Sequence, residues 1–298
     1  HARAKAQLIG KPGHIITVST EHHAVLDPLR QLQKEGFRLS ELQPNKDGLI
    51  NIQQLSEAVE KDTFLVSVMA ANNEIGVLQP IAEIGSFCKR KGIAFHTDAA
   101  QALGYLDLDP DKFLIDLMSL SAHKIYGPKG IGALVIKEGV PIEPTQYGGG
   151  QELGLRSGTL PVPLIVGFAK AVEIARNDQD DRNRRLLFFR NLLLSGLKKN
   201  ISDLIVNGSI DQRLPHNLNI SFPGINGSRL HSQLRKFIFC TSGSACSNGK
   251  PSHVLQVIGL CKANAEASIR MSIGRNTAEK DIKEAIQIIT KIVINLRK

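Results

Sequence analysis

The feature that most limits the possible folds is a regular alternation, from residue 14 onward, between short β-branched apolar runs and longer amphipathic segments. The apolar runs predict five strands, at 14–20, 63–70, 93–98, 114–121 and 131–137. Two of the segments between them, 24–36 and 81–92, end in basic residues and a glycine, which is typical of helix C-termini. Strands separated by helices indicate an α/β fold, with a mostly parallel sheet and helices on both faces.

The pattern changes in the C-terminal part of the chain. A long, highly charged helical segment at 161–200 leads into shorter elements. Strands are predicted at 203–207, 216–222, 237–242 and 267–273, and helices at 227–236, 252–260 and 278–298. This mixture favours an α+β arrangement. We therefore expect a large domain over residues 1–180 and a smaller C-terminal α+β domain over residues 181–298.

Composition excludes several classes of protein. The 298 residues are 42% hydrophobic and 22% charged, as in ordinary globular proteins. No uncharged apolar stretch is long enough to span a membrane, and residues 1–20 do not resemble a signal sequence, so no membrane association is expected. The four cysteines show no paired spacing of the zinc or redox type, which favours a reducing compartment such as the cytoplasm.

The formal net charge of +9 is partly concentrated in the segment 182–199. Basic residues there flank an apolar helical stripe. We interpret this segment as a solvated helix face in preference to a site for nucleic acid or an acidic partner. Nucleic acid is therefore not an expected partner.

Polar residues gather where the predicted strands end, and ligands of parallel sheets bind beyond those carboxyl ends. "TEHHAV" follows the first strand, "ANNEIG" the second and "HTDAAQ" the third, while the fourth ends in "SLSAHKIYGPKG". Lys124 in the last motif offers an amine that, when partly desolvated, can form an imine with a carbonyl group. Ser121 and His123 beside it offer hydrogen bonds to an anion such as phosphate. A strand-end lysine alone would be a solvated charge, but the combination of strand ends favours a site.

Together these motifs resemble the cysteine desulfurases, pyridoxal-phosphate enzymes of the aminotransferase fold type I, in the subgroup that serves iron–sulfur cluster assembly. The resemblance covers nearly the whole chain, through "HIITVSTEHHAVLDP", "NNEIGV", "HTDAAQALG", "SAHKIYGPKGIGAL", "GGGQELGLRSGTLPV", "RLPHNLNISFPG", "SGSACS", "PSHVL" and "IRMSIGR". It implies a homodimeric enzyme that converts L-cysteine to L-alanine. It also implies a partner that accepts the sulfur, such as an iron–sulfur scaffold protein.

The resemblance assigns cofactor-binding roles to individual residues. Lys124 matches the lysine that binds pyridoxal phosphate covalently, and Asp98 matches the carboxylate paired with the pyridine nitrogen. The ring draws electrons only while that nitrogen stays protonated, and a buried carboxylate stabilises its charge. Gln101, expected on the same side of a helix start, matches the glutamine bonded to the phenolic oxygen. Asn73 matches the asparagine near that oxygen and the substrate carboxylate, with a turn asparagine as the alternative.

Further matches concern the ring face and the phosphate. His22 matches the histidine that stacks on the pyridine ring and assists proton transfer, whereas His23 is interpreted as a surface residue. Ser121 and His123 match ligands of the cofactor phosphate. Thr159 resembles a threonine that reaches the phosphate of the neighbouring subunit, which implies a homodimer with its sites at the interface.

Substrate handling is assigned to the C-terminal part. Arg270 matches the arginine that grips the substrate carboxylate, a task suited to a planar bidentate donor, whereas Arg275 is expected to cap or to form a salt bridge locally. Cys246 matches the nucleophile that takes the substrate sulfur as a persulfide. Its loop of serine, glycine and asparagine suits a thiol that must travel to the substrate and then to an acceptor.

The other cysteines, Cys88, Cys240 and Cys261, are interpreted as core residues. Cys246 and His253 form too sparse a set for a metal ion, so no metal site is expected.

The chain departs from the family at its beginning, because the family normally starts with several dozen further residues that include a glycine-containing cradle for the cofactor phosphate. Either the chain is the retained part of a full enzyme, or it is a shortened protein with impaired cofactor binding. Two other functions stay open. One is a selenocysteine lyase or a related pyridoxal-phosphate lyase, and the other is a non-catalytic scaffold that binds iron–sulfur assembly partners.

Overall fold

The structure of the chain, a computed structural model, describes residues 1–241 and 252–298. The chain forms two compact units, each built from several segments. Unit 1 comprises His1–Leu42, Ile50–Ala70 and Gln79–Asn177, and unit 2 comprises Gln43–Leu49, Ala71–Leu78 and Asp178–Lys298. Within the described ranges, no helix combines the length and the apolar character needed to cross a membrane.

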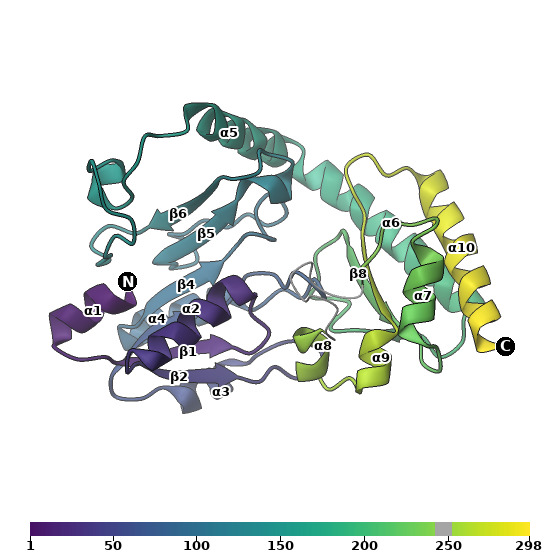
Figure 1. Ribbon diagram of the computed structural model, residues 1–298, viewed down its shortest axis with the longest axis horizontal. Helices are drawn as coiled ribbons and strands as arrows, with labels where there is room; N and C mark the ends of the chain where they lie inside the picture. The colour runs from purple at the N-terminus through teal and green to yellow at the C-terminus, as the bar shows by residue number, and fades with distance from the viewer. Residues whose placement is uncertain (242–251) are drawn as a thin grey trace. The chain divides into compact units, whose positions relative to one another are not determined.

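Unit 1 is built on a six-stranded sheet with the order β2-β1-β3-β4-β5-β6 (Figure 1). Its strands are β1 (His14–Val18), β2 (Arg38–Leu42), β3 (Thr63–Ser67), β4 (Ala94–Asp98), β5 (Leu117–Ser121) and β6 (Gly132–Ile136). The first five run parallel, and β6 pairs antiparallel with β5. Both β1 and β3 are buried along their whole length, as expected of central strands covered on both faces. The predicted mostly parallel α/β sheet is confirmed.

Helices cover this sheet and fix the loops at its strand ends. They are α1 (Ala2–Ile9), α2 (His23–Lys34), α3 (Ile52–Ala58), α4 (Ile81–Lys91) and α5 (Val162–Asn177), with the 3-10 turns η1 (Ala122–Ile125) and η2 (Glu152–Gly154). Ala122 and Ile125 of η1 are buried against Phe168 and Ala171 of α5. This packing holds η1, which carries Lys124, at the end of β5.

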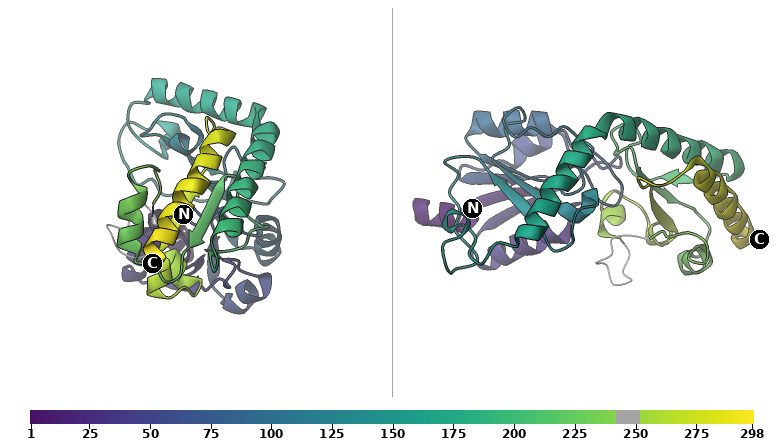
Figure 2. Two further views of the ribbon diagram at one scale, coloured as in Figure 1. Left: turned by 90° about the vertical axis from the view of Figure 1, so that its right-hand side faces the viewer. Right: turned by 90° about the horizontal axis from the view of Figure 1, so that it is seen from above.

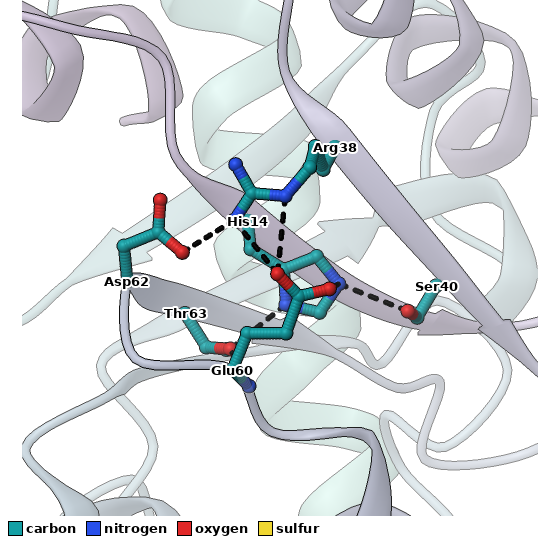
Figure 3. A network of polar contacts seen from close by, with 6 residues as sticks. All are labelled: His14, Arg38, Ser40, Glu60, Asp62 and Thr63. Atoms are coloured by element: carbon teal, nitrogen blue, oxygen red, sulfur yellow. Dashed lines mark hydrogen bonds and ion pairs between the residues drawn. The ribbon is translucent and has the colours of Figure 1, made fainter.

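A polar network joins the amino ends of the first three strands (Figure 3). Its members are His14, Arg38, Ser40, Glu60, Asp62 and Thr63. The buried His14 ring makes hydrogen bonds to the Thr63 hydroxyl at 2.8 Å and to the Ser40 hydroxyl at 2.9 Å. Arg38 donates to Glu60 at 2.8 Å and also pairs with Asp62. Because these residues lie at or near the amino ends of the parallel strands, the network stabilises the edge of the sheet opposite the predicted site.

Unit 2 contains a three-stranded antiparallel sheet, β7-β8-β9. Its elements are β7 (Ile205–Val206), β8 (Asn217–Ser221), β9 (Ser268–Ser272), α6 (Gln179–Asn200), α7 (Gly227–Leu234), α8 (His253–Val257), α9 (Lys262–Glu266) and α10 (Glu279–Arg297). Helices α6 and α10 run side by side (Figure 2). The C-terminal part is therefore α+β, as predicted.

The strand predicted at 237–242 is wrong over its described part. The amides of Phe237 and Ile238 donate to the carbonyl of Leu234, so the chain turns off the end of α7. Only Thr241 pairs with a strand, through an isolated bridge to Arg270. The apolar composition of this segment reflects exposed aromatic side chains, with Phe239 fully exposed, instead of a buried strand.

The cysteines outside the 242–251 segment have three different environments. Cys88 on α4 is buried, which confirms its place in the core, and burial raises the pKa of its thiol to about 12. Cys240 is only half-buried and lies in no strand. Cys261, the N-cap residue of α9, is exposed, so its predicted burial is wrong.

Candidate active site

The carboxyl ends of β1, β4 and β5 position the predicted site residues of unit 1. Asp98 is the last residue of β4, and Ser121 is the last residue of the neighbouring β5. Ser121 leads directly into η1, which carries His123 and Lys124. His22 follows β1 and is the N-cap residue of α2. Because the strands are parallel, all these residues lie at the same edge of the sheet.

The Asp98 carboxyl is partly buried, and His22 and Lys124 are near enough to affect its pKa. Burial raises its pKa, while a 2.9 Å hydrogen bond from the amide of Ala100 and the charges of His22 and Lys124 lower it. These opposing effects show that the three side chains act on one another electrostatically. A carboxyl of this kind suits the protonated nitrogen of a heteroaromatic ring.

His96 supports Asp98 from within the sheet, a role that the sequence analysis missed. It lies two residues earlier on the same strand, so both side chains are on one face. Its ring bonds to the Ser67 hydroxyl on β3 at 2.8 Å and to the Ser119 hydroxyl on β5 at 2.9 Å. Burial lowers the pKa of His96 to about 4, so the ring is neutral at pH 7. The sequence signal for this role was that His96 lies two residues before Asp98 on the same predicted strand.

Beyond β5, the His123 and Lys124 side chains of η1 are exposed. The Ser121 hydroxyl and the Nδ1 atom of His123 are 3.1 Å apart. Partial burial and the charges of Lys124 and Lys129 lower the pKa of His123. His123 and Lys124 lie between Ala122 and Ile125, which are both buried. The chain therefore presents an amine, a hydroxyl and an imidazole from one fixed turn.

The histidines after β1 differ in their contacts. The Nδ1 atom of His22 accepts a 3.1 Å hydrogen bond from the amide of Ala24, so His22 caps α2. His23 is partly exposed and contacts Asp27 at 3.3 Å. The cap holds the His22 ring at the strand end, whereas His23 belongs to the surface of α2.

Gln101 does not lie at a helix start. It sits in a single turn after β4, formed where the amide of Leu103 donates to the carbonyl of Ala99 at 2.9 Å. The chain leaves this turn at Gly104, whose φ of 79° is in the left-handed region. Asp98 and Gln101 are therefore not on one side of a helix, as predicted. They are joined by a turn in which the Asp98 side chain accepts a hydrogen bond from the amide of Ala100.

Thr159 is exposed in the loop that precedes α5. In the described ranges its side chain makes no hydrogen bond, and so none to Ser121 or His123. This leaves its hydroxyl accessible to another chain.

In unit 2, Asn73 and Arg270 come together. The Nη1 atom of Arg270 on β9 donates to the main-chain oxygen of Asn73 at 2.9 Å. Burial lowers the pKa of Arg270, and the nearby charge of Glu74 raises it. Among the described residues the guanidinium makes no other hydrogen bond, so further donors remain for a carboxylate.

The asparagine that forms the turn is Asn72, not Asn73. The Oδ1 atom of Asn72 accepts from the amides of Glu74 at 2.8 Å and Ile75 at 2.9 Å. Asn73 lies within this turn but does not have a positive φ, so it lacks the left-handed geometry of the alternative interpretation.

Cys246 lies outside the described residues. On one side of that segment, the carbonyl of Thr241 accepts from the amide of Arg270 at 2.8 Å. On the other side, Ser252 begins α8. Arg275 pairs with Asp178 at 2.5 Å, so the predicted salt bridge is present, although its partner is distant in sequence.

The donor set in unit 1 fits pyridoxal phosphate. Lys124 supplies an amine for the aldehyde, Asp98 a carboxylate for the ring nitrogen, and Ser121 with His123 a hydroxyl and an imidazole for the phosphate. In the part of the chain that the structure describes, no group of three or more histidine, cysteine or acidic side chains is placed to hold a metal ion.

Comparison with known proteins agrees with this chemistry. The family model for class-V aminotransferases matches residues 2–284. "Cysteine desulfurase IscS" of Vibrio vulnificus is 47% identical over 300 residues, which cover 99% of this chain and 74% of that protein. The same-named protein of Clostridium botulinum is 45% identical and covers 95% and 72%.

Solved structures give the same picture. A structure described as "NIFS-LIKE PROTEIN" superposes with a TM-score of 0.90 at 36% identity, covering 99% of this chain and 79% of that chain. A second, "SspA in complex with cysteine", has a TM-score of 0.78 at 38% identity, covering 91% and 76%.

Proposed function

We propose, since the chain belongs to the class-V aminotransferase family, that it is a pyridoxal-phosphate-dependent cysteine desulfurase supplying sulfur for iron–sulfur cluster assembly. It converts L-cysteine to L-alanine. The observation that carries this proposal is the electrostatic grouping of Asp98, His22 and Lys124 where β4, β1 and β5 end. The relatives named cysteine desulfurase support the choice of substrate.

Pyridoxal phosphate, when bound, supplies an electron sink that weakens the bonds at the α-carbon of an amino acid. Lys124 provides the amine that binds the group and then the base for the α-proton. Asp98 would pair with the protonated ring nitrogen, and His22 would stack on the ring and assist proton transfer. Ser121 and His123 hold the phosphate.

The remaining assignments concern the phenolic oxygen of the cofactor and the substrate carboxylate. Gln101 and Asn73 are assigned to the phenolic oxygen. Asn73 also lies with Arg270, whose spare donors suit the substrate carboxylate. Fixing that carboxylate keeps the α-carbon–hydrogen bond aligned for proton removal.

Cys246 is assigned as the sulfur acceptor. Its thiolate attacks the substrate sulfur, a sulfur–sulfur bond forms, and the carbon–sulfur bond breaks. The bonding electrons stay with the carbon fragment, which takes up protons and leaves as alanine. The step needs no external oxidant, and the persulfide on Cys246 passes to an acceptor or iron–sulfur scaffold protein.

The enzyme is proposed to act as a homodimer in which Thr159 reaches the phosphate held by the neighbouring subunit. Exposed apolar side chains on β6 and α5, including Leu134, Val162 and Val166, support an interface on unit 1. The cytoplasm is the proposed compartment, because a sulfur-carrying thiol must stay reduced.

Two variants test the function. Purified wild-type protein should show the visible absorbance of bound cofactor and release alanine from L-cysteine. Lys124→Ala should lose both. Cys246→Ser should keep the absorbance and lose alanine formation with the persulfide.

Other outcomes would replace the proposal. Unchanged turnover of selenocysteine by Cys246→Ser would indicate a lyase acting by direct elimination. A colourless wild-type protein that binds assembly partners would indicate a scaffold.

A further inference from the structure

Glu74 lies at the centre of the turn that carries Asn73, and the proposed function gives it no role. Its side chain is buried, with 1% of the residue exposed. Its main-chain oxygen accepts hydrogen bonds from the side-chain amides of Asn219 at 3.0 Å and Asn217 at 3.3 Å, both on β8. The backbone of this turn is therefore tied to the sheet of unit 2.

The carboxylate of Glu74 is held by a serine. Its Oε2 atom accepts a hydrogen bond from the hydroxyl of Ser252, which is 2% exposed. The same hydroxyl accepts the amide of Leu255 at 3.1 Å and so caps α8. The Ser252 hydroxyl therefore caps α8 and also binds the buried carboxylate of Glu74.

Arg270 and Glu74 are close enough to interact but are not ion-paired. The charge of Glu74 acts on the guanidinium, and Arg270 binds the carbonyl of the residue next to Glu74. Nevertheless, no ion pair within 4.0 Å joins these two described residues. Buried opposite charges usually close onto each other, because a buried charge without a partner is costly. The Glu74 carboxylate is instead bonded to the Ser252 hydroxyl.

We propose that Ser252 and Glu74 are positioning residues that keep the Arg270 donors available for the substrate carboxylate. While Ser252 restrains Glu74, the guanidinium meets the substrate without an internal competitor. If the restraint is removed, Glu74 turns toward Arg270 and occupies the same donors. The inference rests on the proposed function, because it takes Arg270 as the carboxylate-binding residue.

The test compares two inhibitors that differ by a carboxylate. L-Alanine carries the group that Arg270 binds, and ethylamine is the same molecule without it. The ratio of the Ki for ethylamine to the Ki for L-alanine, measured in competition with L-cysteine, reports the contribution of the carboxylate. In Ser252→Gly this ratio should fall about tenfold, the effect of losing one charge-assisted contact. Glycine is tolerated at helix N-caps, so α8 should still form.

Removing the competitor should reverse the effect. In Glu74→Gln the ratio should equal or exceed that of the wild type, because the amide neither pairs with Arg270 nor repels the substrate. The double variant Ser252→Gly with Glu74→Gln should likewise recover. Ser252→Thr keeps the hydroxyl and is the matched control, with an unchanged ratio.

A purely structural role predicts a different result. Loosening of the site would weaken both inhibitors equally, and the double variant would be worse than either single one. An unchanged ratio in Ser252→Gly, no recovery in the double variant, or a lower ratio in Glu74→Gln each overturns the inference. If Ser252→Gly does not fold, the Glu74→Gln result alone decides.

The proposed function fails separately. A wild-type protein that releases no alanine from L-cysteine, or that binds L-alanine no better than ethylamine, refutes the role of Arg270 itself. If the wild type releases alanine and binds L-alanine better than ethylamine, the role of Arg270 stands. An unexpected result in the variants then counts against the roles of Ser252 and Glu74 alone.

Discussion

At the scale of single residues, the site depends on a buried imidazole that stays neutral. Both ring nitrogens of His96 bond to serine hydroxyls on the neighbouring strands. Burial lowers the pKa of His96 from 6.5 to about 4. A neutral ring in this place links three strands just before Asp98 without adding a positive charge that would compete with the ring nitrogen of the cofactor.

His96 makes stability depend on pH in a defined direction. The unfolded residue takes up a proton near pH 6.5, but the folded residue does so only near pH 4. Its contribution is therefore present above pH 6.5 and is lost as the pH falls toward 4. Between pH 7.5 and 5 it should reduce the free energy of unfolding by about 2 kcal/mol.

Urea unfolding of wild type and His96→Gln at the two pH values measures this effect. The variant should lose about 2 kcal/mol less than the wild type over the same interval. His23→Gln, which alters a partly exposed ring, is the control and should follow the wild type. The same pH dependence in all three proteins would contradict a neutral, buried His96.

At the scale of secondary structure, α4 is held by a close approach that only glycine permits. A Cβ atom on Gly85 would lie 1.9 Å from the carbonyl oxygen of Phe113. The neighbouring helix positions Ile84 and Cys88 are fully buried. Because α4 packs on β4, the strand that ends at Asp98, this contact affects the site as well as the core.

Gly85→Ala should therefore destabilise the protein by roughly 3 kcal/mol, because the helix must shift to accommodate the methyl group. Urea denaturation gives this value. Cofactor titration should show weaker binding, since β4 moves with the helix. Ser86→Ala on the same helix is the control, with an expected change below about 0.5 kcal/mol. Equal stability of Gly85→Ala and Ser86→Ala would show that the close contact between Gly85 and Phe113 does not restrict the residue at position 85.

The sequence predicted strands and helices correctly where the pattern of apolar residues matched the secondary structure. All five predicted strands of unit 1 are present. The central strands β1 and β3 are buried apolar runs, whereas β6 is an apolar run that is largely exposed at the edge of the sheet. The strand β2 was missed because "RLSEL" is an edge strand with one buried residue, Leu42. The opposite error at 237–242 arose because exposed phenylalanines mimic a buried strand. Local sequence does not distinguish an apolar residue that is buried from one that is not.

At the scale of the whole molecule, the units are not continuous in sequence. Ile75 and Val77, which lie between strands of unit 1 along the chain, pack with Val254 and Leu255 of α8 in unit 2. Asn73 meets Arg270 for this reason. The spacing of Asn73 and Arg270 in the sequence does not predict this contact. It arises because the chain passes from unit 1 into unit 2 at residues 71–78 and then returns to unit 1.

The proposed homodimer makes a prediction about mixed subunits. If Thr159 serves the neighbouring site, Lys124→Ala and Thr159→Ala each damage a different half of one shared site. A heterodimer then contains one intact site and one with both defects.

Equal amounts of the two variants, unfolded and refolded together, should recover about a quarter of wild-type activity. The reason is that half of the dimers are mixed and each mixed dimer has one intact site. Sedimentation checks that dimers form, and the separately refolded variants are the control. Activity of the mixture equal to the mean of the separate variants would show that Thr159 acts within its own subunit.

The sequence by itself determined the α/β class, the family and the chemical groups at the strand ends, because apolar periodicity and the order of motifs are written in adjacent residues. Only the tertiary structure decided which groups act on one another. His96 between two serines and Glu74 held by Ser252 both depend on contacts between segments far apart in the chain. The physical reason is that burial and hydrogen bonding, which set charge and orientation, are properties of the packed molecule.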